Sequence, residues 1–275
     1  DQLFRNEGGG FFVDVSQQAG INNRAWGLSA VVNDFNEDGL PDIYIANDYV
    51  EPDMLYLNQG DGTFVDGIEN IIRHSSHNSM GTDLADINND GLLDLFVVDM
   101  LSDSNYRRKA LETLMMPDRY NTLVRHGYGH QVMWNVLQLN NGNGSYSEIG
   151  SLAGVASTDW SWSALFADFD HDGQVDLHIT NGYRYDITNT DYLRYTTDSI
   201  NRIGGLTREM FASFEEYLKI IPTQRVPNFV FQNKGQLQFQ DQTINWGMNQ
   251  PSYSSGSAYA DFDNDGDLDL VVNNM

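Results

Sequence analysis

The chain has 275 residues, enough for one large domain or two small ones with a sizeable buried core. Its formal net charge of −24 makes nucleic acid an unfavourable partner, because the chain and the phosphates repel each other. The absence of cysteine excludes disulfides, zinc–thiolate sites and thiol catalysis. No apolar run approaches the roughly 18 residues of a membrane-spanning helix, so no membrane insertion is expected in this segment.

The first predicted element is a pair of strands at residues 3–12, joined by a glycine-rich hairpin. A strand, an Asp-rich loop at 34–42 and a second strand follow, and then another hairpin pair at 55–64. We call the four strands of this unit A to D: the Asp loop joins strands A and B, and the hairpin joins strands C and D. The whole unit occurs twice more, and a last segment contains only strand A, an Asp loop and strand B. The later Asp loops lie at 86–94, 168–176 and 261–269, and the later hairpin pairs at 137–146 and 230–239.

Four-stranded units repeated in this way predict an all-β fold, a β-propeller with three whole blades and two half-blades. Residues 1–275 are expected to form a single β-propeller domain or a fragment of one. The two half-blades either close on each other as a four-bladed ring or belong to a larger propeller. Open strand edges at both ends favour the larger propeller.

Two units are longer than the first, which places helical inserts between strands B and C at about 101–133 and 182–228. The inserts contain predicted helices at Tyr106–Met116 and at Arg208–Ile220, the second capped by Thr207. Because successive strands of a blade are antiparallel, the A–B and B–C connections leave opposite faces. The inserts are therefore expected on the face opposite to the Asp loops.

Each Asp loop has the pattern D-x-[DN]-x-D-G-x-x-D, which predicts a calcium site. Calcium takes about six to eight oxygen ligands, which side chains at positions 1, 3, 5 and 9 and the carbonyl at position 7 can supply. Glycine at position 6 permits the sharp turn. We expect about four Ca²⁺ ions, no other cofactor and no catalytic residue. The predicted ligands are Asp34, Asn36, Asp38, Leu40, Asp42, Asp86, Asn88, Asp90, Leu92, Asp94, Asp168, Asp170, Asp172, Gln174, Asp176, Asp261, Asp263, Asp265, Asp267 and Asp269.

Two other interpretations of the loops are an EF-hand and an ordinary Asx-rich turn. An EF-hand needs a Glu at position 12, which here is apolar in every loop: Ile45, Val97, Ile179 and Val272. Ordinary turns do not explain why the ninth-position Asp recurs four times. The third and fourth loops carry more carboxylates than the first two, so we expect them to bind calcium more tightly.

Two further groups of side chains are candidate sites, one for a sugar or protein ligand and one for a transition metal. Exposed aromatic clusters bind sugars or proteins, but aromatic rings also fill blade interiors. Histidines spaced three or four apart suggest a transition-metal site, although glycines or a Ser75-Ser76 loop interrupt both pairs here. The aromatic residues expected on the insert face are Trp26, Trp160, Trp162, Tyr183, Tyr185, Tyr192 and Tyr195, and the histidines are His74, His77, His126 and His130.

The loops, together with hairpins such as Leu55-Tyr-Leu-Asn-Gln-Gly-Asp-Gly-Thr-Phe64, resemble the FG-GAP/VCBS repeats of the integrin α-subunit propeller. The runs 79–86, 159–165 and 260–274 resemble bacterial surface or secreted proteins of the cartilage acidic protein (ASPIC/UnbV-associated) group. The resemblance implies about seven blades, calcium in the A–B loops and an extracellular or periplasmic setting. The last hairpin departs from the pattern, with Lys234-Gly-Gln-Leu in place of Gly-Asp-Gly.

These features predict a non-enzymatic, calcium-stabilised module for adhesion or for recognition of a glycan or protein. The alternatives are a polysaccharide-processing, lyase-like enzyme and a passive scaffold segment of a larger surface protein. No motif with a nucleophile beside a base supports an enzyme. Loops of this type suit the millimolar calcium found outside cells, so we expect an extracellular, cell-surface or periplasmic protein of bacterial origin.

Overall fold

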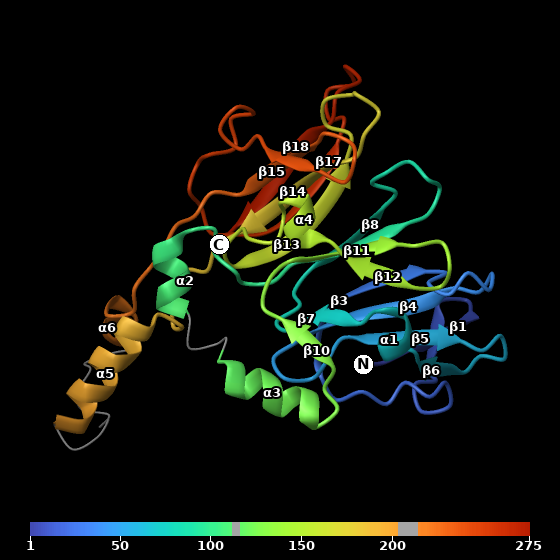
Figure 1. Cartoon of the computed structure of the whole chain (residues 1–275), viewed down its shortest axis with the longest axis horizontal. Helices are drawn as coiled ribbons and strands as arrows, with labels where there is room; N and C mark the ends of the chain where they lie inside the picture. Colours follow the sequence, from blue (N-terminus) through green and yellow to red (C-terminus); the bar gives the residue numbers. More distant parts are fainter. Residues whose placement is uncertain (112–115, 203–213) are drawn as a thin grey trace.

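The computed structural model describes residues 1–111, 116–202 and 214–275, which form several antiparallel sheets arranged as a fan (Figure 1). Three of the sheets have four strands each, and we number these sheets blades 1 to 3. Blade 1 contains β3 (Trp26–Asn33), β4 (Asp42–Asp48), β5 (Met54–Asn58) and β6 (Phe64–Asp66). Blade 2 contains β8 (Thr82–Ala85), β9 (Asp94–Val97), β11 (Val136–Asn140) and β12 (Tyr146–Glu148). Blade 3 contains β13 (Ser161–Ala167), β14 (Asp176–Asn181), β15 (Phe229–Asn233) and β16 (Phe239–Asp241).

The first strands of consecutive blades lie next to one another. Strand β3 contacts β8, β8 contacts β13, and β13 contacts the first strand of the last half-blade. Gly81, just before β8, lies so close to blade 3 that a Cβ there would sit 2.4 Å from the carbonyl oxygen of Trp162. This arrangement of radially packed, four-stranded blades is that of a β-propeller, and the predicted fold class is confirmed.

The hydrophobic core lies between adjacent blades. Both faces of a middle strand contact a neighbouring blade, so β9 is buried along its whole length and β14 likewise. Between blades 2 and 3, the rings of Phe96 and Phe166 meet edge to face with their centroids 6.0 Å apart. The strands are therefore apolar on both faces, which explains the continuous apolar runs in the sequence.

The two half-blades remain separate sheets. Strands β1 (Phe4–Gly8) and β2 (Phe11–Asp14) pair with each other, and so do β17 (Ser254–Ala260) and β18 (Asp269–Asn274). No pairing joins β1 to β18 in the described part of the chain, so the half-blades do not close a four-bladed ring. A ring of about seven blades stays a prediction.

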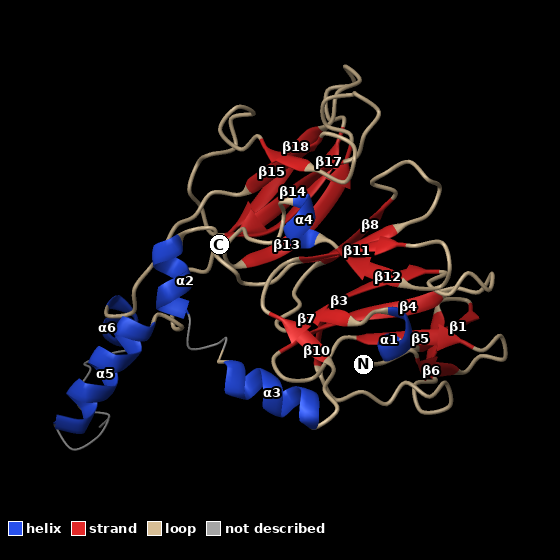
Figure 2. Ribbon diagram, viewed as in Figure 1, coloured by secondary structure: helices blue, strands red, loops and turns tan. Residues whose placement is uncertain are grey.

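Both inserts are helical and lie between strands B and C, as predicted (Figure 2). The first contains α2 (Asn105–Leu111) and α3 (Pro117–Arg125), and the second contains α5 (Thr190–Arg202) and α6 (Phe214–Lys219). The predicted helix 106–116 is described as far as Leu111. Helix α3 begins at the proline that was expected only to end a helix, because proline fits the first position of a helix.

The second insert differs more from its prediction. Helix α5 was not predicted, and α6 corresponds to the end of the helix expected at 208–220. The cap expected at Thr207 lies outside the described residues. Short elements complete the chain: α1 (Ile68–Ile71), α4 (Gly150–Ala153), β7 (His74–Ser76) and β10 (His130–Val132). None of the described helices is long and apolar enough to cross a membrane.

Candidate metal centres

Each Asp loop joins the first strand of a blade to the second, and all four loops have the same backbone conformation. The glycine at position 6 is left-handed in every copy, with φ of +86° at Gly39 and +99° at Gly266. Position 4 is left-handed as well, although its residues carry side chains: Glu37, Asn89, His171 and Asn264, with φ of 63°, 58°, 58° and 61°. Non-glycine residues rarely adopt this conformation, so its fourfold recurrence indicates a loop shape that the fold maintains.

Backbone amides inside the loop hold the carboxylate at position 1. In the first loop, the N–H groups of Asp38 and Gly39 donate to the two oxygens of Asp34 at 3.0 and 2.7 Å. The N–H of Leu40 donates to the carboxylate of Asp38 at 2.8 Å. The same contacts recur in the other three loops. The backbone N–H groups of each loop therefore fix the positions of the carboxylates at positions 1 and 5.

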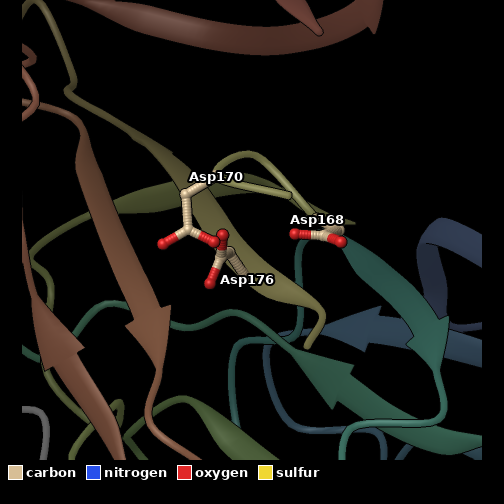
Figure 3. A group of neighbouring side chains, drawn as sticks. All are labelled: Asp168, Asp170 and Asp176. Carbon is tan, nitrogen blue, oxygen red and sulfur yellow. The ribbon is translucent and has the colours of Figure 1, made fainter. Parts of the chain in front are cut away.

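In the third and fourth loops the carboxylates converge. One oxygen from each of Asp168, Asp170 and Asp176 lies within 4.8 Å of the others, and Figure 3 shows these carboxylates turned toward one another. Oxygens of Asp261, Asp263 and Asp265 converge within the same distance. The first two loops carry an asparagine at position 3, Asn36 and Asn88, and so have one carboxylate fewer.

The Asp at position 9 has a structural role that the sequence did not reveal. Asp176 is fully buried, and its two oxygens accept the N–H groups of Asn233 at 2.9 Å and Phe169 at 3.1 Å. Asn233 ends strand β15, so this carboxylate ties the loop to the third strand of its own blade. Asp42 and Asp94 make the same two kinds of bond with their blades. Because a carboxylate oxygen has two lone pairs, these bonds leave room for a metal ion.

The electrostatics of position 9 favour a cation nearby. Burial, helped by the neighbouring loop carboxylates, raises the pKa of Asp94 and of Asp176 to about 6, although the backbone hydrogen bonds lower it. The pKa of Asp42 is raised for the same reasons. A divalent ion held by oxygen ligands would offset both the burial and the repulsion between carboxylates. The donor set thus fits a hard cation such as Ca²⁺.

Adjacent loops also touch one another. The amide of Asn89 in the second loop donates to the carbonyl of Gly173 in the third at 3.3 Å. His171 in the third loop approaches Asp267 in the fourth, with 3.3 Å between Nε2 and Oδ1. In both cases the left-handed residue at position 4 reaches the next loop. The second, third and fourth loops therefore form a continuous row along one face of the propeller.

The predicted ligands now divide into groups. The structure brings together three carboxylates in each of the third and fourth loops. It places position 9 at the start of the second strand, buried in the first three loops and exposed in the fourth. At position 7 the loop residues donate N–H groups to position 5, and their role as carbonyl ligands stays a prediction. These residues are Leu40, Leu92, Gln174 and Asp267.

The other candidate residues are arranged differently from the sequence expectation. Ser75 and Ser76 belong to strand β7 and not to a loop, because β7 pairs in parallel with β10. This pairing places the rings of His74 and His130 5.5 Å apart, although the spacing in sequence suggested other pairs. Trp160 stacks on Tyr183 at 4.5 Å and packs partly against the core of blades 2 and 3.

The blades, the glycine hairpins and the repeated Asp loops define a propeller-type repeat protein. A family model described as "FG-GAP-like repeat" matches residues 34–97 and 123–179, each running from an Asp loop or insert to a second strand. The chain therefore contains stretches similar to FG-GAP-like repeats, as its motifs predict.

Its curated relatives include cartilage acidic protein 1 from three vertebrates. The Mus musculus protein is 29% identical over 185 residues, covering 66% of this chain and 25% of that protein. The Xenopus tropicalis protein is 24% identical over 271 residues, covering 94% of this chain and 30% of that protein. The Homo sapiens protein is 22% identical over 200 residues, covering 62% of this chain and 30% of that protein. The chain thus spans between a quarter and a third of the length of these relatives.

A solved structure, described as an Agrocybe aegerita lectin recognising non-reducing terminal N-acetylglucosamine, is similar at 16% identity with a TM-score of 0.41. The match covers 98% of this chain and 54% of the lectin.

Proposed function

We propose that this chain is a calcium-stabilised, non-enzymatic recognition module that presents a glycan- or protein-binding surface outside the cell. The observation that carries the proposal is the convergence of Asp168, Asp170 and Asp176, whose ligand oxygens lie within 4.8 Å of one another in a loop shape repeated four times.

Calcium would act on stability rather than on chemistry. The loop carboxylates repel one another and, at position 9 of the first three loops, are also removed from water. A bound divalent ion therefore stabilises the folded state over the unfolded chain by linkage. Each of the first three loops ties its blade's first two strands to the third, as Asp176 does through Asn233. Metal in the loops would thus stiffen one end of the propeller while the other end remains available for a ligand.

The experiment is thermal unfolding of the 275-residue chain in EDTA, in millimolar Ca²⁺ and in Mg²⁺ at the same concentration. We expect Ca²⁺ to raise the melting temperature well above the value in EDTA, and Mg²⁺ to raise it less. Asp265→Ala should lose part of the rise, while Asp241→Ala, an exposed change outside the loops, should keep it. Equal melting temperatures in all three conditions would show that the loops are ordinary turns.

An extracellular setting follows from the same chemistry. Sites with this many exposed ligands suit the millimolar calcium outside cells. The similarity to cartilage acidic protein 1 supports the same setting. The proposed extracellular setting is tested by fractionating cells of the native host and measuring how much of the parent protein lies outside the cytoplasm.

One observation favours a second candidate, a polysaccharide lyase. The Tyr120 hydroxyl lies 2.7 Å from Nδ1 of His130, and His74 with Arg73 lines the adjacent pocket of about 540 Å³. A lyase needs a base, an acid and a cation beside the substrate carboxylate, and these residue types supply all three. Formation of unsaturated uronate products, lost in Tyr120→Phe, would establish this candidate. Saturable binding without product would establish recognition.

A further inference from the structure

The basic residues of this acidic chain are concentrated in the two inserts. Eleven of its fifteen lysines and arginines lie within 101–133 and 182–228, but only nine of its 39 acidic residues do. The basic residues are Arg107, Arg108, Lys109, Arg119, Arg125, Arg184, Arg194, Arg202, Arg208, Lys219 and Arg225. The inserts therefore carry a slight positive charge, and the rest of the chain carries all of the excess negative charge.

This charge separation follows the fold. The Asp loops precede the second strand of each blade and the inserts follow it, so the two groups lie at opposite ends of the blades (Figure 1). At physiological ionic strength charges are screened over about 8 Å, so a ligand at the inserts is largely shielded from the acidic loops. An anionic ligand can therefore approach the insert end.

A groove runs between the inserts, which we call the insert groove. Helices α2 and α5 contact each other and form its walls, and Ser151 of α4 with Ala156 and Ser157 of the following loop forms part of its floor. Its volume is about 1230 Å³, larger than the roughly 300–1,000 Å³ of most small-molecule sites. Arg108, Lys109 and Arg194 line it, and Asp191 is the single acidic residue among its described lining residues.

A buried ion pair holds the walls in place. Arg107 on α2 donates to Asp159 at 2.5 and 2.9 Å and to Asp186 at 2.9 Å. Asp159 precedes blade 3 and Asp186 begins the second insert, so one arginine joins both inserts to the propeller. All three side chains are nearly buried, with exposed fractions of 11%, 3% and 4%. The groove is therefore part of the fold rather than a gap between loose helices.

The neighbouring cations have no acidic partner among the residues that the structure describes. Arg108 donates to the carbonyl of Ser102 at 2.6 Å and to the hydroxyl of Ser157 at 2.7 Å, both uncharged acceptors. Lys109 and Arg194 are exposed, and neither forms an ion pair in the described part of the chain. Among the described lysines and arginines only Arg5 and Arg107 form ion pairs, so what distinguishes the groove is that three of its lining residues are cations and only one is acidic.

The groove also offers contacts suited to sugar rings. The Tyr106 ring on α2 is 70% exposed and lines the groove. Exposed aromatic rings stack on the apolar faces of sugars, so Tyr106 offers such a stacking surface.

We propose that the insert groove binds an acidic polysaccharide, whose carboxylates are met by Arg108, Lys109 and Arg194 and whose rings stack on Tyr106. The groove volume of about 1230 Å³ accommodates several linked sugars, and its three cations match the repeated carboxylates of such a chain. An acidic peptide fits less well, because the helical walls have no free backbone groups for its main chain. This inference rests on the proposed recognition function and names its ligand class.

The test is calorimetric titration of the calcium-loaded chain with a hyaluronan oligosaccharide, in which every second sugar carries a carboxylate. The control ligand is the same oligosaccharide with its carboxylates reduced to alcohols. We expect binding of the acidic form, weakening with added salt, and much weaker binding of the reduced form. Equal binding of both forms, or no binding of either, would overturn the proposal.

Variants locate the site. Lys109→Gln and Arg194→Gln should each weaken binding by about two- to fivefold, as expected for exposed ion pairs, and Arg108→Gln/Lys109→Gln/Arg194→Gln together by more than about tenfold. Arg202→Gln on the same helix α5 and Lys234→Gln on a distant hairpin should change it less than about twofold. An unchanged affinity in the triple variant, with unchanged circular dichroism, would show that the groove is not the site.

Polyglutamate and a single-stranded oligonucleotide of matched charge complete the experiment. Tighter binding of either than of the oligosaccharide would contradict the ligand class. A calcium-dependent melting temperature together with no binding of the acidic oligosaccharide would overturn only this inference. A melting temperature that does not change with calcium would instead overturn the proposed stabilisation by calcium, whatever result the titration with the oligosaccharide gives.

Discussion

Ser79 and Asp53 join the first two blades through a buried hydrogen bond, with 2.8 Å between Oγ of Ser79 and Oδ2 of Asp53. The same carboxyl group accepts the backbone N–H of Asn47 at 2.8 Å and the hydroxyl of Tyr44. Both Asp53 and Ser79 are completely buried. Burial raises the pKa of Asp53 to about 7, and the hydrogen bonds oppose this only in part.

This pKa makes stability depend on pH. The pKa of Asp53 is raised in the fold from 3.8, so its contribution to stability is complete below about pH 3.8 and is lost as the pH rises toward 7. Relative to Asp53→Asn, we expect the wild-type free energy of unfolding to fall by about 2 kcal/mol between about pH 5 and 7. Urea denaturation in EDTA at several pH values measures this. Ser79→Ala keeps the carboxyl group and should keep the slope; parallel curves for wild type and Asp53→Asn would contradict the assignment.

The ninth and fifth positions of an Asp loop should respond differently to mutation. Asp176→Ala leaves the N–H groups of Asn233 and Phe169 without their acceptor, so we expect a loss of about 2–5 kcal/mol even in EDTA. Asp172→Ala, in the exposed part of the same loop, should lower only the stabilisation by calcium. Denaturant unfolding with and without calcium separates the two effects. Equal losses in EDTA would show that position 9 has no separate structural role.

The number of carboxylates should set the affinity of each loop. Asp170→Asn makes the third loop resemble the first, and we expect its calcium affinity to fall by about tenfold, since ligand charge tunes affinity. Asn36→Asp makes the opposite change in the first loop and should raise its affinity. Calorimetric titration of calcium into each variant measures both. Affinities that do not follow the charge would mean that other ligands dominate.

Arg107 should be essential for the placement of the inserts. Arg107→Met leaves Asp159 and Asp186 as buried charges without a partner, so we expect a loss of about 3–5 kcal/mol. The triple variant Arg107→Met/Asp159→Asn/Asp186→Asn removes the charges together and should recover much of the loss. Urea denaturation compares the variants, and limited proteolysis should show faster cleavage in the inserts of Arg107→Met. A loss below about 1 kcal/mol would show that this ion pair contributes no more than a surface pair.

The repeat made most of the fold predictable. The loops and hairpins recur at fixed places relative to short apolar runs, so the strand order A to D, the three blades and the positions of both inserts followed from the sequence. The details of the inserts did not. Helix α3 begins at Pro117, because proline fits the first position of a helix as well as the residue after one. Helix α5 has an ordinary N-cap, Asn189, whose Oδ1 accepts the N–H of Tyr192 at 3.0 Å, and this signal was missed.

The candidate metal centres were predictable as a pattern, because ligands at alternate positions of one loop are local in sequence. The local pattern did not reveal the second role of the ninth-position Asp. Its partners in the third strand, Asn58, Asn140 and Asn233, lie 16, 46 and 57 residues away. The left-handed residues at position 4 were also missed, because Glu37, Asn89, His171 and Asn264 share no side-chain property.

The sequence alone therefore determined the class of fold, the blade order and the four acidic loops, because strand periodicity, glycine turns and ligand spacing all act over a few residues. Only the tertiary structure decided which distant groups meet. It paired His74 with His130, tied Arg107 to Asp159 and Asp186, and placed three cations along one groove. These contacts depend on how the blades and inserts pack against one another, and burial and charge at such contacts are properties of the assembled surface rather than of any segment of the chain.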